Sequence, residues 1–258
     1  MTTETPQFAV ESGHYYWPDG RPCYTVPNKS KPGTERNTMV KDCRKLGLAV
    51  GTTTVIRMAA APQLERWKRN QVLLSALTLP RIDDESETDW LARVEQDWQQ
   101  QGRAAADRGT AIHGAIEQFY RDGVFVKGFA DYVGIAFDHI LDACGQQKWS
   151  AERSFAHTLG YGGKTDLHSD EWVIDVKTKD GDLSKVELYD EHEMQLAAYR
   201  RGLPVSKTRL DRRCGILFVS RDIPVAKFVE VPEPDLVRGL FMFDALLAFW
   251  KAKNRVMT

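Results

Sequence analysis

The segment Gly162-Gly-Lys-Thr-Asp-Leu-His-Ser-Asp-Glu-Trp-Val-Ile-Asp-Val-Lys-Thr178 decides the fold and the chemistry expected of this chain. It predicts two short strands joined by a turn at Ser169-Asp170, because β-type residues flank that turn. Strand alternation places Asp175 and Lys177 on one face of the second strand. Antiparallel pairing across the turn brings Asp166 close to Asp175. We therefore expect two carboxylates and one ammonium group to meet here.

Two carboxylates in close contact at pH 7 require a bound cation or a raised pKa. Mg²⁺ meets that requirement because it takes oxygen ligands and retains waters for substrate phosphates. Lys177 would then hold a water molecule that attacks a phosphodiester. The alternative is an ordinary ion pair between Asp175 and Lys177 at a strand end. A D-x-K tripeptide by itself favours that alternative, because it is common by chance.

The rest of the second half predicts an α/β fold. Apolar residues recur at helical spacing over 126–144 and 187–201. Gly202 and Pro204 end the second of these helices. The predicted order is helix, three strands, helix, strand, followed by one more strand and a final helix to about Lys253. The strands, read from alternation and turn residues, are expected at about 150–157, 161–168, 171–177, 213–219 and 226–231.

The first half is less regular. Asp19-Gly20 lies between aromatic and β-branched residues and predicts a hairpin. We expect its aromatic side chains to pack on the core; the alternative is that they are exposed and stack on bases. The pattern becomes helical over about 52–121, where Pro62 suits a first helical position. We expect Gly102 and Gly109 to break or bend this helical run, because glycine is a poor helix former.

Length and charge exclude some classes of protein. The 258 residues suit one α/β domain, or a core domain with a large insertion. Thirty-five Lys and Arg against 36 Asp and Glu give a net charge of −1, which argues against a histone-like polycation. A local basic groove for nucleic acid remains compatible with that balance. No apolar run approaches the roughly 18 residues of a membrane span, and Met1–Pro6 lacks signal-peptide character. We expect a cytoplasmic protein without a membrane partner.

Four motifs follow one another in the order helix, strand, strand, helix. They are Gly109 to His113, Gly163 to Asp166, Asp175 to Lys177, and Gln195 to Tyr199. This combination, over about residues 105–201, resembles the RecB-like branch of the PD-(D/E)XK nuclease superfamily. Two positions depart from the pattern, since Thr165 stands where the family name has a proline and the second acid is Asp175 rather than Glu. Neither change removes a ligand oxygen.

The resemblance implies a metal site. Asp166 and Asp175 are similar to the metal-binding carboxylates of the family, with the backbone carbonyl of Val176 as a further ligand. His113 is similar to the additional ligand that this branch supplies from its helix. One or two Mg²⁺ or Mn²⁺ ions are implied as cofactors.

The resemblance also implies roles for three other side chains. Lys177 is similar to the catalytic lysine that positions the attacking water. Gln195 and Tyr199 are similar to the helix motif that orients this lysine and contacts DNA near the scissile phosphate. Glu117 and Glu152 are weaker candidates, and we expect them to form salt bridges or to lie outside the ligand shell.

The cysteines bear on a related assignment. Iron–sulfur nucleases of CRISPR adaptation share the same core motifs but need clustered cysteines near the end of the chain. Here the cysteines form no C-x-x-C pair and Cys214 stands alone, so we expect free thiols and no iron–sulfur cluster. The four lie at positions 23, 43, 144 and 214.

The implied fold is a restriction-endonuclease-like core, a mixed central sheet flanked by helices in α-β-β-β-α-β order, over residues 105–258. Residues 1–104 would form a hairpin and helical region beside a DNA cleft. Within it, Ala49–Ile56 and Leu64–Lys68 resemble the lead-in of phage exonucleases and of the mitochondrial genome maintenance exonuclease. In those proteins such helices help to form a passage for single-stranded DNA. This likeness suggests a bacterial cell or a phage-infected host.

The function implied by the resemblance is metal-dependent hydrolysis of DNA by an exonuclease that favours single-stranded ends and leaves a 5′-phosphate and a 3′-hydroxyl. Three alternatives stay open: a duplex-end recombination exonuclease, a structure-specific endonuclease, and a non-catalytic DNA-binding protein on a nuclease core. Basic residues near the motifs in sequence are expected to contact DNA. They are Arg108, Arg153, Lys164, Lys179 and Arg200.

Overall fold

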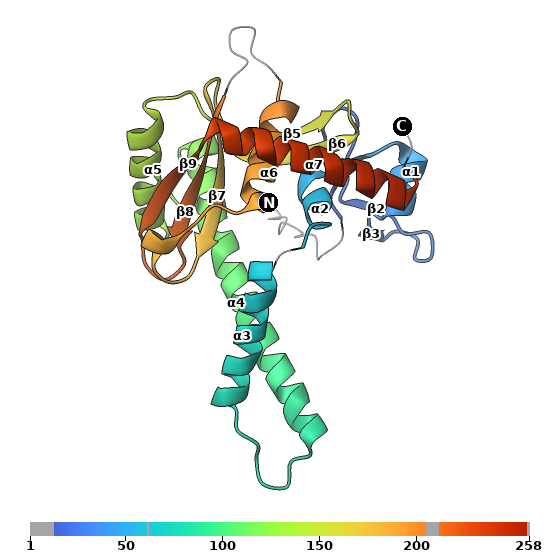
Figure 1. Cartoon of the computed structure of the whole chain (residues 1–258), viewed down its shortest axis with the longest axis vertical. Helices are drawn as coiled ribbons and strands as arrows, with labels where there is room; N and C mark the ends of the chain where they lie inside the picture. Colours follow the sequence, from blue (N-terminus) through green and yellow to red (C-terminus); the bar gives the residue numbers. More distant parts are fainter. Residues whose placement is uncertain (1–12, 61, 205–211, 257–258) are drawn as a thin grey trace.

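A mixed β-sheet forms the centre of the protein, as expected (Figure 1). The computed structural model describes residues 13–60, 62–204 and 212–256. The strand order is β1-β4-β6-β7-β8-β9, and β5 pairs with the remaining edge of β6. The strands are β1 (Tyr15–Tyr16), β4 (Ala49–Gly51), β5 (Ser150–His157), β6 (Tyr161–His168), β7 (Trp172–Lys179), β8 (Arg213–Ser220) and β9 (Ala226–Val231).

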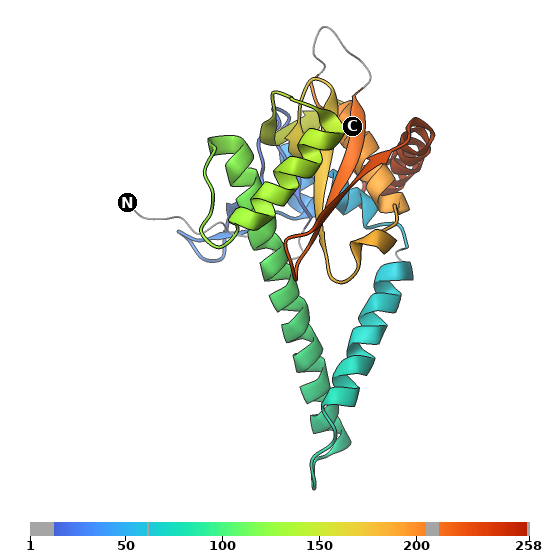
Figure 2. The same ribbon diagram turned by 90° about the vertical axis from the view of Figure 1, so that its left-hand side faces the viewer.

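Helices cover both faces of this sheet (Figures 1 and 2). Alternation along β7 sends Val173 into the core on one face of the sheet and Ile174 into the core on the other face. A small second sheet pairs β2 (Thr25–Pro27) with β3 (Glu35–Asn37). The helices are α1 (Val40–Leu46), α2 (Thr52–Ile56), α3 (Pro62–Thr78), α4 (Glu87–Asp122), α5 (Ala130–Cys144), α6 (Asp190–Gly202) and α7 (Glu233–Asn254), with a 3₁₀ turn η1 (Leu183–Lys185).

All five strands expected in the second half are present, each within two residues of its expected bounds. The helix expected over 126–144 begins only at Ala130. Near Asp19-Gly20 the chain reverses, with Tyr16 bridged to Pro22, and Tyr15 and Tyr16 are buried as expected. All four cysteines are buried. In the part of the chain that the structure describes, no helix is both long and apolar enough to cross a membrane.

In the first half, one strand was not predicted and one expectation was wrong. Strand β4 is too short to show a periodic pattern in the sequence, and it pairs with both β1 and β6. The helical run is not broken at Gly102 or Gly109, because α4 continues from Glu87 to Asp122. A glycine inside a helix lowers the stability of that helix by about 1 kcal/mol relative to alanine. Packing of the rest of α4 offsets this loss. Because α4 also crosses residue 104, it links the two predicted regions, and a boundary there remains a prediction.

Helices α3 and α4 form a hairpin that projects from the body of the protein (Figure 2). Ser86 caps the beginning of α4, since its hydroxyl accepts a hydrogen bond from the Asp89 amide at 3.1 Å. Gly123 ends the same helix in the left-handed region at φ 69°. The N-terminal part of α4 belongs to the hairpin, whereas its C-terminal turns pack on the sheet.

Burial of two histidines predicts loss of stability in mild acid. Burial lowers the pKa of His192 to about 3, with Lys177 and Lys179 adding to the effect, and it lowers the pKa of His168 to about 4. Below pH 6.5 the unfolded chain binds protons that the folded chain does not, so stability falls as the pH falls from 6.5 toward these values.

His192 is expected to lower the free energy of unfolding by about 1.4 kcal/mol for each pH unit of acidification. His168 contributes less because it is less buried and solvent screens its charge. Urea unfolding at pH 7, 6 and 5 measures this slope. His192→Asn keeps an acceptor for the Tyr189 amide, which lies 3.2 Å from the His192 Nδ1 atom. In this variant the pH dependence of the free energy of unfolding should decrease by the contribution of one proton. An unchanged slope in this variant would show that His192 does not titrate as described.

Candidate active site

The site lies where β6 and β7 separate. These strands pair only at Leu167 with Ile174 and at His168 with Val173. Asp166 and Asp175 occupy the next pair of positions, where the ladder has opened. In place of a strand partner, the Val176 amide donates a hydrogen bond to Asp166 Oδ2 at 2.7 Å. The antiparallel register therefore brings the two predicted carboxylates to one fork in the sheet.

Helix α4 brings His113 to Asp166. The His113 Nε2 atom lies 2.9 Å from Asp166 Oδ2. The Asp166 charge raises the pKa of His113 despite the burial of the imidazole. In turn, burial works against ionisation of Asp166, but the charge and hydrogen bond of His113 outweigh it and lower the pKa of that carboxyl. One carboxylate of the fork is therefore held ionised by a histidine from the helix.

The second carboxylate belongs to a network from β7 and α6. Asp175 Oδ2 lies 2.8 Å from Lys177 Nζ, and Asp175 Oδ1 accepts a hydrogen bond from Gln195 Nε2 at 2.7 Å. Lys177 Nζ also donates to Gln195 Oε1 at 3.1 Å. Gln195 Nε2 contacts the Tyr199 hydroxyl at 3.2 Å. Gln195 thus bridges the acid and the lysine, and Tyr199 supports it one helical turn later.

Burial sets the protonation of this network. It raises the pKa of Asp175 to about 6, although Lys177 opposes the rise. For Lys177 burial alone would lower the pKa, but Asp175 and Asp166 reverse that effect and raise it. The ammonium group of Lys177 is therefore retained at neutral pH, and this residue acts as a cation and hydrogen-bond donor.

The residues present fit a hard divalent cation. Asp175 Oδ2 is buried and receives no hydrogen bond of normal geometry from the described residues, although Lys177 Nζ lies close. This leaves a carboxylate oxygen of Asp175 without a donor among the described residues, at the fork that also carries Asp166. Carboxylate oxygens with one imidazole suit Mg²⁺ or Mn²⁺. The carbonyl ligand expected from Val176 stays a prediction, since the contact seen at that residue comes from its amide.

Two more carboxylates lie close to His113. One ligand atom each of His113, Glu117 and Glu152 lies within 4.8 Å of the others. As expected, both acids form salt bridges, Glu117 with Arg121 at 2.6 Å and Glu152 with Lys164. Sequence reasoning did not foresee the backbone of Glu152, which has a left-handed φ of 57°. It interrupts the β5–β6 ladder directly opposite Asp166, so the sheet is distorted on this edge of the site too.

Glycine allows α4 to approach β7 closely. A Cβ atom on Gly109 would lie 2.5 Å from the Thr178 hydroxyl oxygen, next to Lys177 in sequence. The glycine that begins the G-x-x-x-H motif therefore controls how deeply His113 reaches into the fork. A similar contact involves the glycine-rich lead, because a Cβ on Gly163 would lie 2.6 Å from the Tyr199 ring.

Gly109→Val is expected to push α4 away from β7, to cost about 1–3 kcal/mol of stability, and to lower the rate of any reaction at the fork by about tenfold or more. Gly109→Ala meets only a hydroxyl, so Thr178→Ala in the same chain should restore most of what Gly109→Ala loses. Thermal melting and rate measurements on the two single variants and the double variant test this. Strictly additive effects would show that the two residues do not meet.

The predicted DNA contacts lie on several elements. Arg153 is exposed on β5, and Lys164 on β6 pairs with Glu152. Arg108 donates to the Tyr132 hydroxyl at 3.0 Å, and the Lys179 ammonium lies 5.4 Å from the centre of the Tyr189 ring. Arg200 forms an ion pair with Glu233 at 2.6 Å. Of these five residues, Lys164 has the most direct link to the site, through its ion pair with Glu152. The roles of all five in DNA binding remain predictions.

Comparison with known proteins finds resemblance only among solved structures. No protein family profile matches the chain, and no curated protein matches it. A candidate exonuclease from Eubacterium rectale is 9% identical, with a TM-score of 0.41, over 58% of this chain and 69% of that one. The alkaline exonuclease LHK-Exo from Laribacter hongkongensis is 12% identical, with a TM-score of 0.36, over 81% of this chain and 95% of that one. The chemistry of the site must therefore be inferred from its own residues.

Proposed function

We propose that this protein is a Mg²⁺- or Mn²⁺-dependent deoxyribonuclease, and specifically an exonuclease that favours single-stranded ends. The observation that carries the proposal is the convergence of three elements on one fork in the sheet. Helix α4 supplies His113, the two strands supply Asp166, Asp175 and Lys177, and α6 fixes the lysine through Gln195. A simple strand-end ion pair would not require the buried bridging glutamine or the histidine.

Asp166, Asp175 and His113 are the residues that would hold the cation. When bound, a divalent cation would supply positive charge for the phosphate in the transition state and favour ionisation of a nearby water. The raised pKa of Asp175 is consistent with this role, because it reflects a buried acid whose charge is only partly compensated by the protein. A cation would complete that compensation.

Lys177 is the residue that we assign to the nucleophile and the scissile phosphate. Its ammonium group is held by Asp175 and Gln195, so one direction remains for a water or a phosphate oxygen. Because its pKa is raised, it orients the water by hydrogen bonding and does not take the proton. In-line attack of water on phosphorus would form the new P–O bond as the P–O3′ bond breaks, with one proton of that water passing through solvent to the departing 3′-oxygen. The products would be a 5′-phosphate and a 3′-hydroxyl.

The preference for single-stranded ends rests on the resemblance of the first half to exonucleases. Of the two segments that carry this resemblance, Ala49–Ile56 forms β4 and α2 beside β6. Thr52 donates a hydrogen bond to the Gly162 carbonyl at 2.9 Å, and Val50 pairs with Tyr161. This segment thus supports the strand that carries Asp166.

Digestion of three end-labelled or closed DNA substrates tests the proposal. The substrates are a linear single strand, a linear duplex and a covalently closed single-stranded circle. With Mg²⁺ or Mn²⁺ we expect loss of the linear single strand, slower loss of the duplex, and survival of the circle. Cleavage of the circle would favour an endonuclease, and faster loss of duplex would favour the recombination exonuclease. DNA binding without cleavage under any metal would contradict the catalytic proposal.

A further inference from the structure

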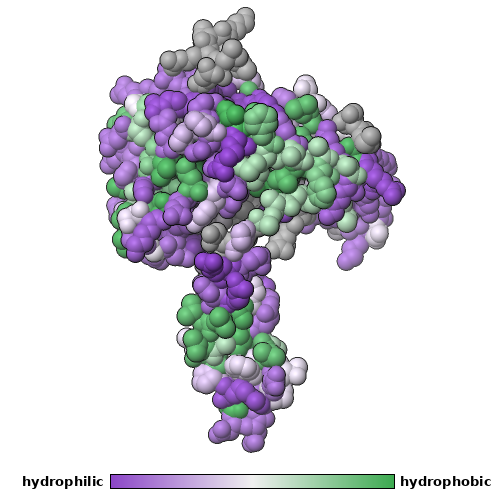
Figure 3. All heavy atoms as spheres, viewed as in Figure 1, coloured by the Kyte–Doolittle hydropathy of each residue, from purple (hydrophilic) through white to green (hydrophobic). Residues whose placement is uncertain are grey.

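The hairpin of α3 and α4 carries large apolar side chains that no described residue covers. Leu73, Leu74 and Leu77 are 57%, 53% and 79% exposed, and Ile82 beyond them is 63% exposed. Figure 3 shows apolar residues gathered on the hairpin, apart from the body of the protein. A contiguous patch of this kind typically marks an interaction surface, whereas single exposed leucines do not.

The patch occupies one face of α3. Positions 66, 70, 73, 74 and 77 follow helical spacing and lie on the same side of the helix. The opposite side packs toward α4, where Ser75 is 1% exposed. The three leucines therefore point away from the hairpin's own interior and cannot be buried by a small shift of α4.

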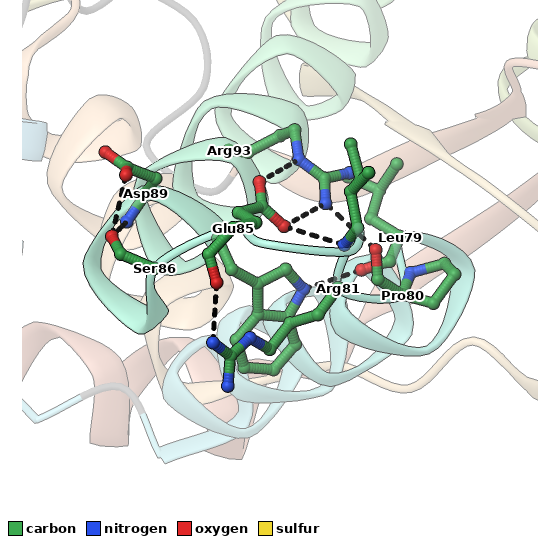
Figure 4. A network of polar contacts seen from close by, with 9 residues as sticks. Leu79, Pro80, Arg81, Glu85, Ser86, Asp89 and Arg93 are labelled. Atoms are coloured by element: carbon green, nitrogen blue, oxygen red, sulfur yellow. Dashed lines mark hydrogen bonds and ion pairs between the residues drawn. The ribbon is translucent and has the colours of Figure 1, made fainter.

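A network of hydrogen bonds and an ion pair joins the residues at the tip of the hairpin (Figure 4). Arg93 binds the Glu85 carboxylate through Nε at 3.0 Å and Nη2 at 2.8 Å. The Glu85 carboxylate also accepts the Ile82 amide at 3.1 Å, and the Trp90 indole donates to the Leu79 carbonyl at 2.7 Å. A surface that is already ordered loses little conformational entropy on binding, so the entropic cost of binding a partner at this tip is low.

Charge changes sign along the hairpin. Arg66 and Arg69 lie at the base of α3, are exposed, and form no ion pair with the described residues. Asp83 and Asp84 lie at the tip, are exposed, and are likewise outside the Glu85–Arg93 network. The hairpin is thus net basic over residues 65–69, apolar over 73–77 and net acidic over 81–85, with Glu65 and Arg81 of the opposite sign at the two ends. Such a surface is complementary to itself when a second copy runs in the opposite direction.

We propose that this face binds a second copy of the chain in an antiparallel, two-fold symmetric dimer. An axis near the middle of the leucine cluster would place Leu74 against the partner's Leu77, and Arg69 near the partner's Asp83. The contact is isologous, as two-fold dimers require. Because the hairpin projects away from the body (Figures 1 and 2), the two bodies would lie at opposite ends without collision.

The size of the surface sets the expected strength. The 17 residues of α3 span about 25 Å at 1.5 Å per residue. An interface one helix wide is at the small end of the range for specific contacts, so we expect a weak dimer whose formation depends on protein concentration.

Sedimentation velocity of the full chain, from about 1 µM to about 200 µM, tests the proposal. Wild type should pass from monomer to dimer over this range. Leu77→Lys should weaken association at least tenfold, whereas Leu159→Lys, at a leucine 45% exposed on the body, should not change it. A monomeric wild type throughout, or equal effects of the two substitutions, would overturn the proposal.

A charge exchange tests the antiparallel arrangement. One variant carries Arg66→Glu and Arg69→Glu, and the other carries Asp83→Lys and Asp84→Lys. Each alone should be monomeric because base and tip then repel, while an equimolar mixture should form a heterodimer because both contacts become attractive. Circular dichroism confirms folding of each variant. A mixture that stays monomeric overturns the proposal, as does a first variant that loses DNA affinity with unchanged association, which would assign the arginines to DNA.

Discussion

Replacement of Lys177 by alanine is expected to lower the rate constant of DNA hydrolysis by about 10²–10⁴-fold while leaving DNA affinity within a few-fold of wild type. The reason is that Lys177 Nζ is fixed by Asp175 and Gln195 at the fork and keeps its proton. Removing it takes away the group that orients the water and offsets charge on the phosphate. Single-turnover rates at saturating protein, with affinity measured separately in Ca²⁺, separate the two effects.

Lys179 provides the matched control on the same strand. Its ammonium group lies over the Tyr189 ring, and we predict that it contacts DNA but not the reacting atoms. Lys179→Ala should therefore weaken DNA affinity with little change in the single-turnover rate. If Lys177→Ala kept a rate within threefold of wild type, or if both variants behaved alike, the catalytic assignment of Lys177 would be refuted.

Asp175→Asn is expected to abolish the stabilisation of the protein by divalent cations. A cation at about 100 times its dissociation constant stabilises the folded state by about 2.7 kcal/mol, or about 5–10 °C in melting temperature for a chain of this size. The variant keeps an oxygen that can accept the Gln195 hydrogen bond but loses the charge and the free lone pair of Oδ2. Thermal melting with EDTA, Mg²⁺ and Mn²⁺ gives a result that does not depend on activity.

The control for Asp175→Asn is Asp170→Asn. Asp170 lies in the turn that joins the same two strands, and it is exposed. Its loss should leave the cation-dependent rise in melting temperature intact. An Asp175→Asn protein that still gained several degrees from Mg²⁺ or Mn²⁺ would show that the cation binds elsewhere, for example between His113, Glu117 and Glu152.

The local pattern predicted the strands that carry the site, because β6 and β7 are long enough to show alternation on each side of a clear turn. From that turn the meeting of Asp166 and Asp175 followed directly, since antiparallel register is fixed by the turn. The fork itself was not predictable. It forms where β4 takes the edge of β6 beside Tyr161 and Gly162, and β4 is a short strand more than a hundred positions earlier in the chain.

The roles of glycine and of Glu152 also depend on distant contacts. Helix propensity suggested that Gly109 interrupts α4, yet the helix continues and the missing side chain instead makes room for Thr178. Glu152 adopts a backbone conformation that non-glycine residues rarely take, and no local signal marks it. Periodicity reports which face of an element is buried, whereas close approaches between elements appear only in the assembled fold.

The central claim is that this fork hydrolyses DNA with a bound divalent cation. Its most direct test is a time course on a 5′-labelled single strand, first in EDTA and then after addition of excess Mg²⁺, with identification of the new ends. We predict no cleavage in EDTA, cleavage on addition of Mg²⁺, and products with 5′-phosphate and 3′-hydroxyl ends that are absent with Lys177→Ala. Folded, DNA-binding wild-type protein that produces no cleavage in either Mg²⁺ or Mn²⁺ would contradict the claim.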